Sequence, residues 1–232
     1  MLEIKTFGSS SNGNCYLLKD GDSYLLLEAG IQPKRMQLDW SKIEGVLISH
    51  EHQDHAKYAK EIIKRTGADF YCSEGTSSVL RGVPSHRIHV ASSKRSFNIG
   101  GWKIMPFDVE HDAKEPLGFL IETPTKRRVL FATDTYYIRY KFTGITHLMI
   151  ECNYDLDILE DNFLSRKIDK KQRLRIITSH FELSNVKQFL KVNDLSKLQE
   201  VHLLHLSDRN SDAERFKREI QAIVGVPTYI AG

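Results

Sequence analysis

The sequence predicts an α/β or α+β fold in which mixed β-sheets are flanked by helices. Strand-like apolar runs and segments with helical periodicity alternate along the 232 residues. Short turns often separate consecutive strands, which favours hairpins and therefore sheets with antiparallel pairs. No internal repeat and no low-complexity linker interrupts the chain, so we expect a single domain over residues 1–232.

The individual elements follow from local patterns. Residues 2–7 alternate as a strand does, and an Asp-Gly turn between the apolar runs 15–18 and 24–27 predicts a hairpin. A helix is expected over residues 56–66, because apolar residues recur at helical spacing and Gly67 follows. Further strands are expected at residues 46–49, 68–72, 102–109, 119–123, 129–132, 147–150 and 201–206, and further helices at 156–163, 185–191 and 213–223.

The composition is that of an ordinary globular protein. Hydrophobic residues make up 41% and charged residues 27%, and the net charge of +3 neither demands nor excludes nucleic acid. No apolar run reaches the about 18 to 20 residues of a membrane span, and the N-terminus lacks a signal-peptide pattern. Three widely spaced cysteines, Cys15, Cys72 and Cys152, do not suggest a disulfide framework. We therefore expect a cytoplasmic protein without membrane association, and we infer no obligate protein partner.

The most informative stretch is His-Glu-His-Gln-Asp-His at residues 50–55, directly after a short apolar run. Histidine and aspartate are costly at the end of a buried strand unless they are paired. A divalent metal pairs with both, because neutral imidazole and carboxylate are its ordinary ligands. His50 and His52 can point the same way along an extended segment, whereas Asp54 and His55 are adjacent, as in a loop or a first helical turn. This spread suits two metals better than one; the alternative is a polar turn with solvated histidines.

Three further polar residues follow the apolar runs of expected strands: His111 after residues 104–109, Asp134 after 129–132 and His205 after 201–204. In α/β architectures, ligands collect at the edge where strands end. Each of the three alone is more often a capping or solvated residue. Together with His50, however, they indicate strand ends that share metal-ligand chemistry.

The ordered motifs resemble the metallo-β-lactamase superfamily. The motif at residues 50–55 is highly specific, and Glu-His-Asp-Ala, Ala-Thr-Asp-Thr and Leu-Leu-His-Leu-Ser follow it in the right order. Additional segments resemble the YycJ/WalJ-like branch, and they lie at residues 9–16, 111–119, 151–155 and 205–210. The resemblance spans nearly the whole chain. It implies an α/β fold of the αββα sandwich type, with two mixed β-sheets flanked by helices and a two-metal site at one edge.

The resemblance also implies which residues bind two divalent ions. The first ion would be bound by His50, His52 and His111. The second would be bound by Asp54, His55 and His205, with Asp134 as the bridge. Such a set leaves room for water, and two metals about 3.5–4 Å apart can share a hydroxide whose pKa falls to about 7. These ligand types suit Zn or Mn, and Fe remains possible.

Proton transfer is expected from Glu151 and His180, which resemble the glutamate–histidine pair of tRNase Z-like nucleases. A carboxylate that keeps an imidazole charged makes it a good general acid. The alternative for His180 is a structural role. Asp54 counts as a catalytic residue as well as a ligand. Glu28 stands where the family usually has aspartate, so it either orients ligating imidazoles or is a simple turn carboxylate.

Substrate contacts are expected in the loop between the first two strands, where small residues let backbone N–H groups approach an anion. The loop residues are Ser10, Ser11, Asn12, Gly13 and Asn14. Such a loop is usually just a turn. Asn185 is a further candidate, although Ser184 or Asn185 is most simply a helix N-cap. Six basic residues within 165–175, to which residues 126–128 could add, either attract a phosphate backbone or form a solvated face.

The sequence therefore predicts a dinuclear metal-dependent hydrolase, foremost a phosphodiesterase or nuclease acting on DNA. Members of the YycJ/WalJ-like branch are linked to 5′-to-3′ exonuclease action. One alternative is a hydrolase of a small phosphodiester, thioester or lactone, because fold does not fix function. The other is a non-catalytic, metal-stabilised nucleic-acid-binding module.

Overall fold

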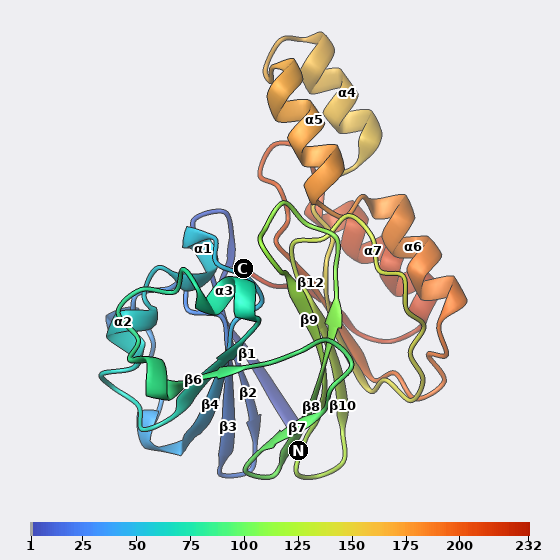
Figure 1. Cartoon of the computed structure of the whole chain (residues 1–232). Helices are drawn as coiled ribbons and strands as arrows, with labels where there is room; N and C mark the ends of the chain where they lie inside the picture. Colours follow the sequence, from blue (N-terminus) through green and yellow to red (C-terminus); the bar gives the residue numbers. More distant parts are fainter. Residues whose placement is uncertain (1) are drawn as a thin grey trace. The chain divides into compact units, whose positions relative to one another are not determined.

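The computed structural model in Figure 1 describes residues 2–232. The chain separates into two compact units, which we call unit 1 and unit 2. Unit 1 contains residues 2–108, 113–127 and 232, and unit 2 contains residues 109–112 and 128–231. The single domain over residues 1–232 stays a prediction.

Unit 1 contains a six-stranded mixed sheet in the order β1-β2-β3-β4-β5-β6. The first three strands are antiparallel, and the strands from β3 to β6 are parallel. The expected hairpin is confirmed as β2–β3, with Gly21 at φ 65° in its turn. The strands are β1 Leu2–Ser10, β2 Gly13–Asp20, β3 Ser23–Leu27, β4 Ile43–Leu47, β5 Asp69–Cys72 and β6 Ile88–Val90.

Unit 1 also contains an antiparallel run of β7 Phe97–Ile99, β8 Trp102–Asp108 and β9 Leu117–Glu122. Strands of both directions occur in each of the two sheets, so the predicted α/β class with two mixed sheets flanked by helices is confirmed. The short elements β6, β7 and α3 (Glu74–Ser77) were not expected, because three or four residues carry little periodicity.

The continuous helix expected over residues 56–66 is wrong. Two single-turn helices stand there instead, α1 Gln53–Ala56 and α2 Ala59–Ile62. The break occurs at Tyr58, whose φ of −105° and ψ of 14° leave the helical region. Its N–H donates to the carbonyl of Ala29 at 2.9 Å. A tertiary hydrogen bond therefore replaces the one that would continue the helix.

Unit 2 contains four parallel strands in the order β13-β12-β11-β10. They are β10 Arg128–Ala132, β11 His147–Glu151, β12 Glu200–Leu204 and β13 Thr228–Ile230. Parallel neighbours need crossover connections. The crossover from β11 to β12 contains α4 Leu156–Leu164, α5 Lys170–Ser179 and α6 Leu183–Val192, and that from β12 to β13 contains α7 Ala213–Val224. Figure 1 shows α4 and α5 side by side as a helical hairpin.

Helix α5 was missed from the sequence, and its residues 170–179 include part of the basic segment 165–175. Asp169 caps this helix through the N–H of Gln172 at 2.7 Å. The expected N-cap of the next helix is wrong. The N-cap of α6 is Glu182, not Ser184 or Asn185, because its carboxylate accepts from the N–H groups of both. None of the described helices combines the length and the apolar character needed to cross a bilayer.

The parallel register of unit 2 brings three strand ends to one edge. Ala132 pairs with Ile150, and Glu151 pairs with Leu204. The carboxyl ends of β10, β11 and β12 therefore lie level with one another. Asp134, Glu151 and His205 come at or just after these ends, so the sheet itself gathers them.

In unit 1, the loop after β3 packs closely on the start of α1. The N–H of Ala29 donates to the carbonyl of His55 at 2.6 Å, and the N–H of Gly30 donates to that of Asn14 at 2.9 Å. A Cβ atom on Gly30 would lie 1.7 Å from the carbonyl oxygen of Asp54. Only glycine therefore allows this approach.

We expect Gly30→Ala to lower the free energy of unfolding by about 1–3 kcal/mol, because backbone atoms must move to admit the methyl group. Urea unfolding followed by circular dichroism measures this change. Gly67→Ala is the matched control, because a Cβ atom there meets no atom within 4 Å, and its effect should stay within about 1 kcal/mol. Equal unfolding midpoints for the two variants would contradict the packing argument.

Candidate metal centre

The His-Glu-His-Gln-Asp-His segment of unit 1 forms a compact imidazole cluster. It leaves β4 in extended conformation, and α1 begins at Gln53. The ring centroids of His50 and His52 lie 4.7 Å apart, and those of His50 and His55 lie 4.1 Å apart. His50 Nδ1 lies 2.8 Å from Ser49 Oγ. The side chains of His50, His52 and His55 therefore lie close together within unit 1, and their role as metal ligands stays a prediction.

Asp54 and His55 are held by polar groups from neighbouring strands. Asn14 Nδ2 lies 3.3 Å from Asp54 Oδ2 and 3.0 Å from His55 Nε2. Glu28 Oε2 lies 3.4 Å from His55 Nδ1. The glutamate also accepts from the N–H of Ser49 at 3.1 Å. Asn14 and Glu28 therefore fix the orientation of the Asp54–His55 pair.

The Glu28 side chain points into the protein interior, where it contacts His55 and Ser49. Its side chain is fully buried, so the simple turn reading is wrong. Its backbone adopts φ 65°, a left-handed conformation uncommon for a residue with a side chain. Burial raises the pKa of Glu28, and the opposing effects of His55 and Ser49 do not cancel this rise. The longer side chain is accommodated because it spans from the turn to both Ser49 and His55.

In unit 2, Asp134 lies between two imidazoles. Its Oδ1 is 3.3 Å from His205 Nδ1, and its Oδ2 is 3.8 Å from His111 Nε2. The hydroxyl of Thr133 donates to Oδ1 at 2.8 Å. Asp134 and His205 have φ values of 37° and 52°. Backbone in this sparsely populated region is typical of functional sites.

Glu151 is the centre of the polar network in unit 2. Its Oε1 accepts from His180 Nδ1 at 2.7 Å and from His205 Nδ1 at 3.0 Å. Its Oε2 accepts from the backbone N–H groups of Thr135 and Phe181 at 2.8 and 3.1 Å. The side chain is fully buried. One carboxylate thus fixes two imidazoles and two loops.

The environment of His180 favours its charged form. Burial alone would lower the pKa of His180, but the charge and hydrogen bond of Glu151 outweigh burial and raise the pKa to about 9. Glu151 responds in the opposite direction, because His180 lowers the pKa of the carboxyl despite its burial. The predicted Glu151–His180 pair is therefore present as a charge-assisted hydrogen bond.

Four imidazoles share one feature that suits metal binding. In each, Nδ1 contacts an oxygen atom, which fixes the ring and leaves Nε2 as the nitrogen that would bind a metal. In His55, Asn14 Nδ2 also lies 3.0 Å from this nitrogen. The partners are Ser49 for His50, Glu28 for His55, the carbonyl of Ser179 for His111 and Glu151 for His205. Ligand atoms of Asp134, Glu151, His180 and His205 lie within 4.8 Å of one another. The donor chemistry therefore fits divalent metal ions in both units.

The remaining candidates have different surroundings. Ser10 ends β1, Gly13 begins β2 and is buried, and Ser11 and Asn12 form an exposed turn between them. Asn185 is exposed on the first turn of α6. In the basic segment, Arg173 binds Glu160, and Arg175 Nε lies 3.4 Å from Asp112 Oδ2. Lys126 pairs with Glu122, and Arg128 donates to the carbonyl of Thr143.

Several positioning residues were missed from the sequence. Ser49, Thr135 and Ser179 each contact a site residue, and Asn153 Nδ2 donates to the carbonyl of His205 at 2.7 Å. Three of them directly precede or follow a candidate residue. That adjacency was the available signal, but small polar residues beside strand ends are too common to be informative alone.

Comparison with known proteins identifies the family. Residues 24–203 match the β-lactamase superfamily domain. The chain belongs to the β-lactamase superfamily. Exodeoxyribonuclease WalJ of Streptococcus pneumoniae is 27% identical over 223 residues, covering 89% of this chain and 82% of the relative. Exodeoxyribonuclease YycJ of Bacillus anthracis is 22% identical over 240 residues, covering 96% and 89%.

Solved structures support the same fold. The metallo-β-lactamase fold protein YhfI from Bacillus subtilis superposes with a TM-score of 0.75 at 16% identity, covering 100% of this chain and 97% of that one. Zn²⁺-bound PqqB from Methylobacterium extorquens gives a TM-score of 0.74 at 13% identity, with the same coverage. The resemblance to the metallo-β-lactamase superfamily and its YycJ/WalJ-like branch is therefore confirmed. The chain is a member of a superfamily of metal-dependent hydrolases.

We expect Glu151→Ala to destabilise the protein by about 3–5 kcal/mol, because removing one partner leaves buried charged and polar groups unsatisfied. Guanidinium unfolding of the purified variants measures the change. Glu61→Ala is the control, because Glu61 is exposed and such surface changes cost within about 0.5 kcal/mol. A Glu151→Ala protein as stable as this control would show that the network is dispensable.

Proposed function

We propose that the protein is a dinuclear metal-dependent phosphodiesterase that cleaves DNA, of the 5′-to-3′ exonuclease type. The main support comes from the relatives named exodeoxyribonucleases, because this chain covers more than four fifths of their length. The polar network of unit 2 is the structural support, because it places His180, whose pKa is raised to about 9, close to the candidate ligands Asp134 and His205.

His50, His52 and His111 would hold one ion, and Asp54, His55 and His205 would hold the other, with Asp134 shared between the ions. Within unit 2, the two oxygens of Asp134 lie near different imidazoles, with Oδ1 near His205 and Oδ2 near His111. When bound, the ions supply Lewis-acid activation of water and charge neutralisation of the phosphate. Zn, Mn or Fe suits this donor set.

The protein's own contribution is to hold and deliver a proton. Glu151 engages Nδ1 of His180 and keeps the imidazole charged. The opposite nitrogen, Nε2, is then the donor to the leaving oxygen of the DNA strand. Asp54 would help to hold an ion, and Asn14 Nδ2 contacts its side chain at 3.3 Å.

We also propose that DNA contacts the amino-terminal part of α5 and the loop before it. Of the six basic residues, Arg173 and Arg175 have acidic partners within the protein. Arg166, Lys167, Lys170 and Lys171 are exposed. These four side chains can neutralise phosphates without losing an internal ion pair. The loop residues Ser10 to Asn14 are the second proposed contact.

We expect metal-dependent cleavage of labelled DNA. Protein stripped with a chelator should be inactive, and Mn²⁺ or Zn²⁺ should restore cleavage. Asp134→Ala should lower the metal content measured by mass spectrometry and abolish activity, because the bridge is lost. Wild type that leaves DNA intact but hydrolyses a small phosphodiester, thioester or lactone would overturn the DNA assignment. DNA retention without any hydrolysis would instead favour a binding module.

The role of His180 has a separate test. His180→Ala should lower kcat on DNA by about 10²- to 10⁴-fold, the range for loss of general acid catalysis. Hydrolysis of bis(p-nitrophenyl) phosphate should fall far less, because p-nitrophenolate leaves without a proton. Metal content should be unchanged, and the exposed His86→Ala serves as the control. Equal losses on both substrates would exclude the proton-donor role.

A further inference from the structure

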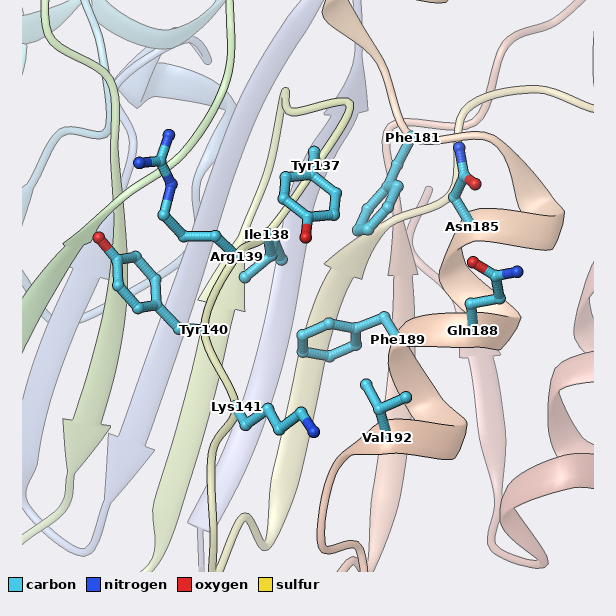
Figure 2. A pocket seen from close by; sticks show the side chains of 10 residues that line it. All are labelled: Tyr137, Ile138, Arg139, Tyr140, Lys141, Phe181, Asn185, Gln188, Phe189 and Val192. Carbon is cyan, nitrogen blue, oxygen red and sulfur yellow. The ribbon is translucent and has the colours of Figure 1, made fainter.

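Unit 2 contains an aromatic hollow of about 280 Å³ that the proposed chemistry does not use. Figure 2 shows the rings of Tyr137, Phe181 and Phe189 facing one another, with Asn185 and Gln188 on the adjoining face of α6. The ten lining residues are Tyr137, Ile138, Arg139, Tyr140, Lys141, Phe181, Asn185, Gln188, Phe189 and Val192.

The floor of the hollow is fixed before any ligand arrives. Phe189 is buried, and its ring lies 6.4 Å from the rings of both Phe142 and Phe181 in tilted and T-shaped arrangements. Asn193 anchors Phe142 by accepting its N–H at 2.6 Å. Tyr137, in contrast, is 55% exposed, so its ring presents a large apolar face to solvent. A rigid apolar floor beside an exposed ring provides a stacking surface.

Both walls of the hollow are tied to Glu151. Phe181 follows His180, and its N–H donates to Glu151 Oε2. On the other side, the N–H of Thr135 donates to the same oxygen, and the hydroxyl of Thr135 donates to the carbonyl of Tyr137 at 2.9 Å. The segments that carry Tyr137 and Phe181 are therefore anchored to the carboxylate that also contacts the proposed proton donor, His180.

The polar groups at the rim suit the edge of a heteroaromatic ring. Asn185 and Gln188 are exposed and project side-chain amides, each of which offers donors and an acceptor. Lys141 supplies a positive charge, whereas Arg139 is paired with Glu110. Amides with one cation match a base attached to a phosphate better than they match a purely apolar group.

We propose that this hollow binds one unpaired nucleobase of the DNA strand, stacked between Tyr137 and the Phe189 floor. The proposal rests on the proposed DNA function and specifies its substrate, a strand whose terminal base is unpaired. The volume is close to the lower limit for ligand sites, which favours one planar base over a longer group. Because every base has an aromatic face that can stack, we expect this site to accept any of the four bases.

Binding of 2′-deoxyadenosine 5′-monophosphate and of 2-deoxyribose 5-phosphate tests this, measured by calorimetry with metal-supplemented protein. The two probes share the sugar phosphate, so their affinity ratio reports the base alone. We expect the nucleotide to bind at least about 5-fold more tightly. Tyr137→Ala should reduce nucleotide affinity by about 5- to 100-fold and leave the sugar phosphate unchanged.

A matched control for Tyr137→Ala lies in the same unit. Tyr229→Ala removes a tyrosine that is 45% exposed outside the hollow. Equal affinity for the two probes, or equal effects of Tyr137→Ala and Tyr229→Ala, would overturn the nucleobase site. If metal-dependent DNA cleavage persists in that case, the proposed function stands. If the base is bound but no DNA is cleaved, the site stands and the nuclease assignment fails.

Discussion

The polar site of unit 2 depends on the hydrogen bonds that the buried carboxylate of Glu151 accepts. A buried charge is costly unless hydrogen bonds and an opposite charge compensate for it. Here the compensation comes from His180, His205 and two backbone N–H groups, which belong to separate segments of the chain. The same side chain therefore stabilises the folded arrangement of these segments and fixes the geometry of the site.

The two units position their polar residues by different structural features. In unit 2, parallel register aligns the ends of three strands, and left-handed backbone at Asp134 and His205 turns the chain just beyond them. In unit 1, a single strand end carries the histidine-rich segment, and close packing on Gly30 holds it. Unit 2 therefore relies on the register of its sheet, whereas unit 1 relies on a backbone contact that only glycine permits.

The sequence was sufficient for the fold class and for most strand ends, because apolar runs that stop at His, Asp or Glu are visible without a structure. The proximity of His50 and His52 was also expected, because alternate residues of an extended segment point the same way. Tertiary contacts were beyond such reasoning. The break at Tyr58 arises from a hydrogen bond to Ala29, which is distant in sequence. Helix α5 was hidden by its charged composition, and the aromatic hollow combines two segments that share no periodicity.

The four donors on Glu151 limit what that residue can do. An ionised carboxylate offers about four lone-pair sites, and His180, His205, Thr135 and Phe181 take one each. A metal ion would have to displace one of these donors to gain a bond. Glu151 is therefore saturated as an acceptor, and although it lies among potential ligands, its geometry reserves it for orienting imidazoles and leaves coordination to Asp134 and the histidines.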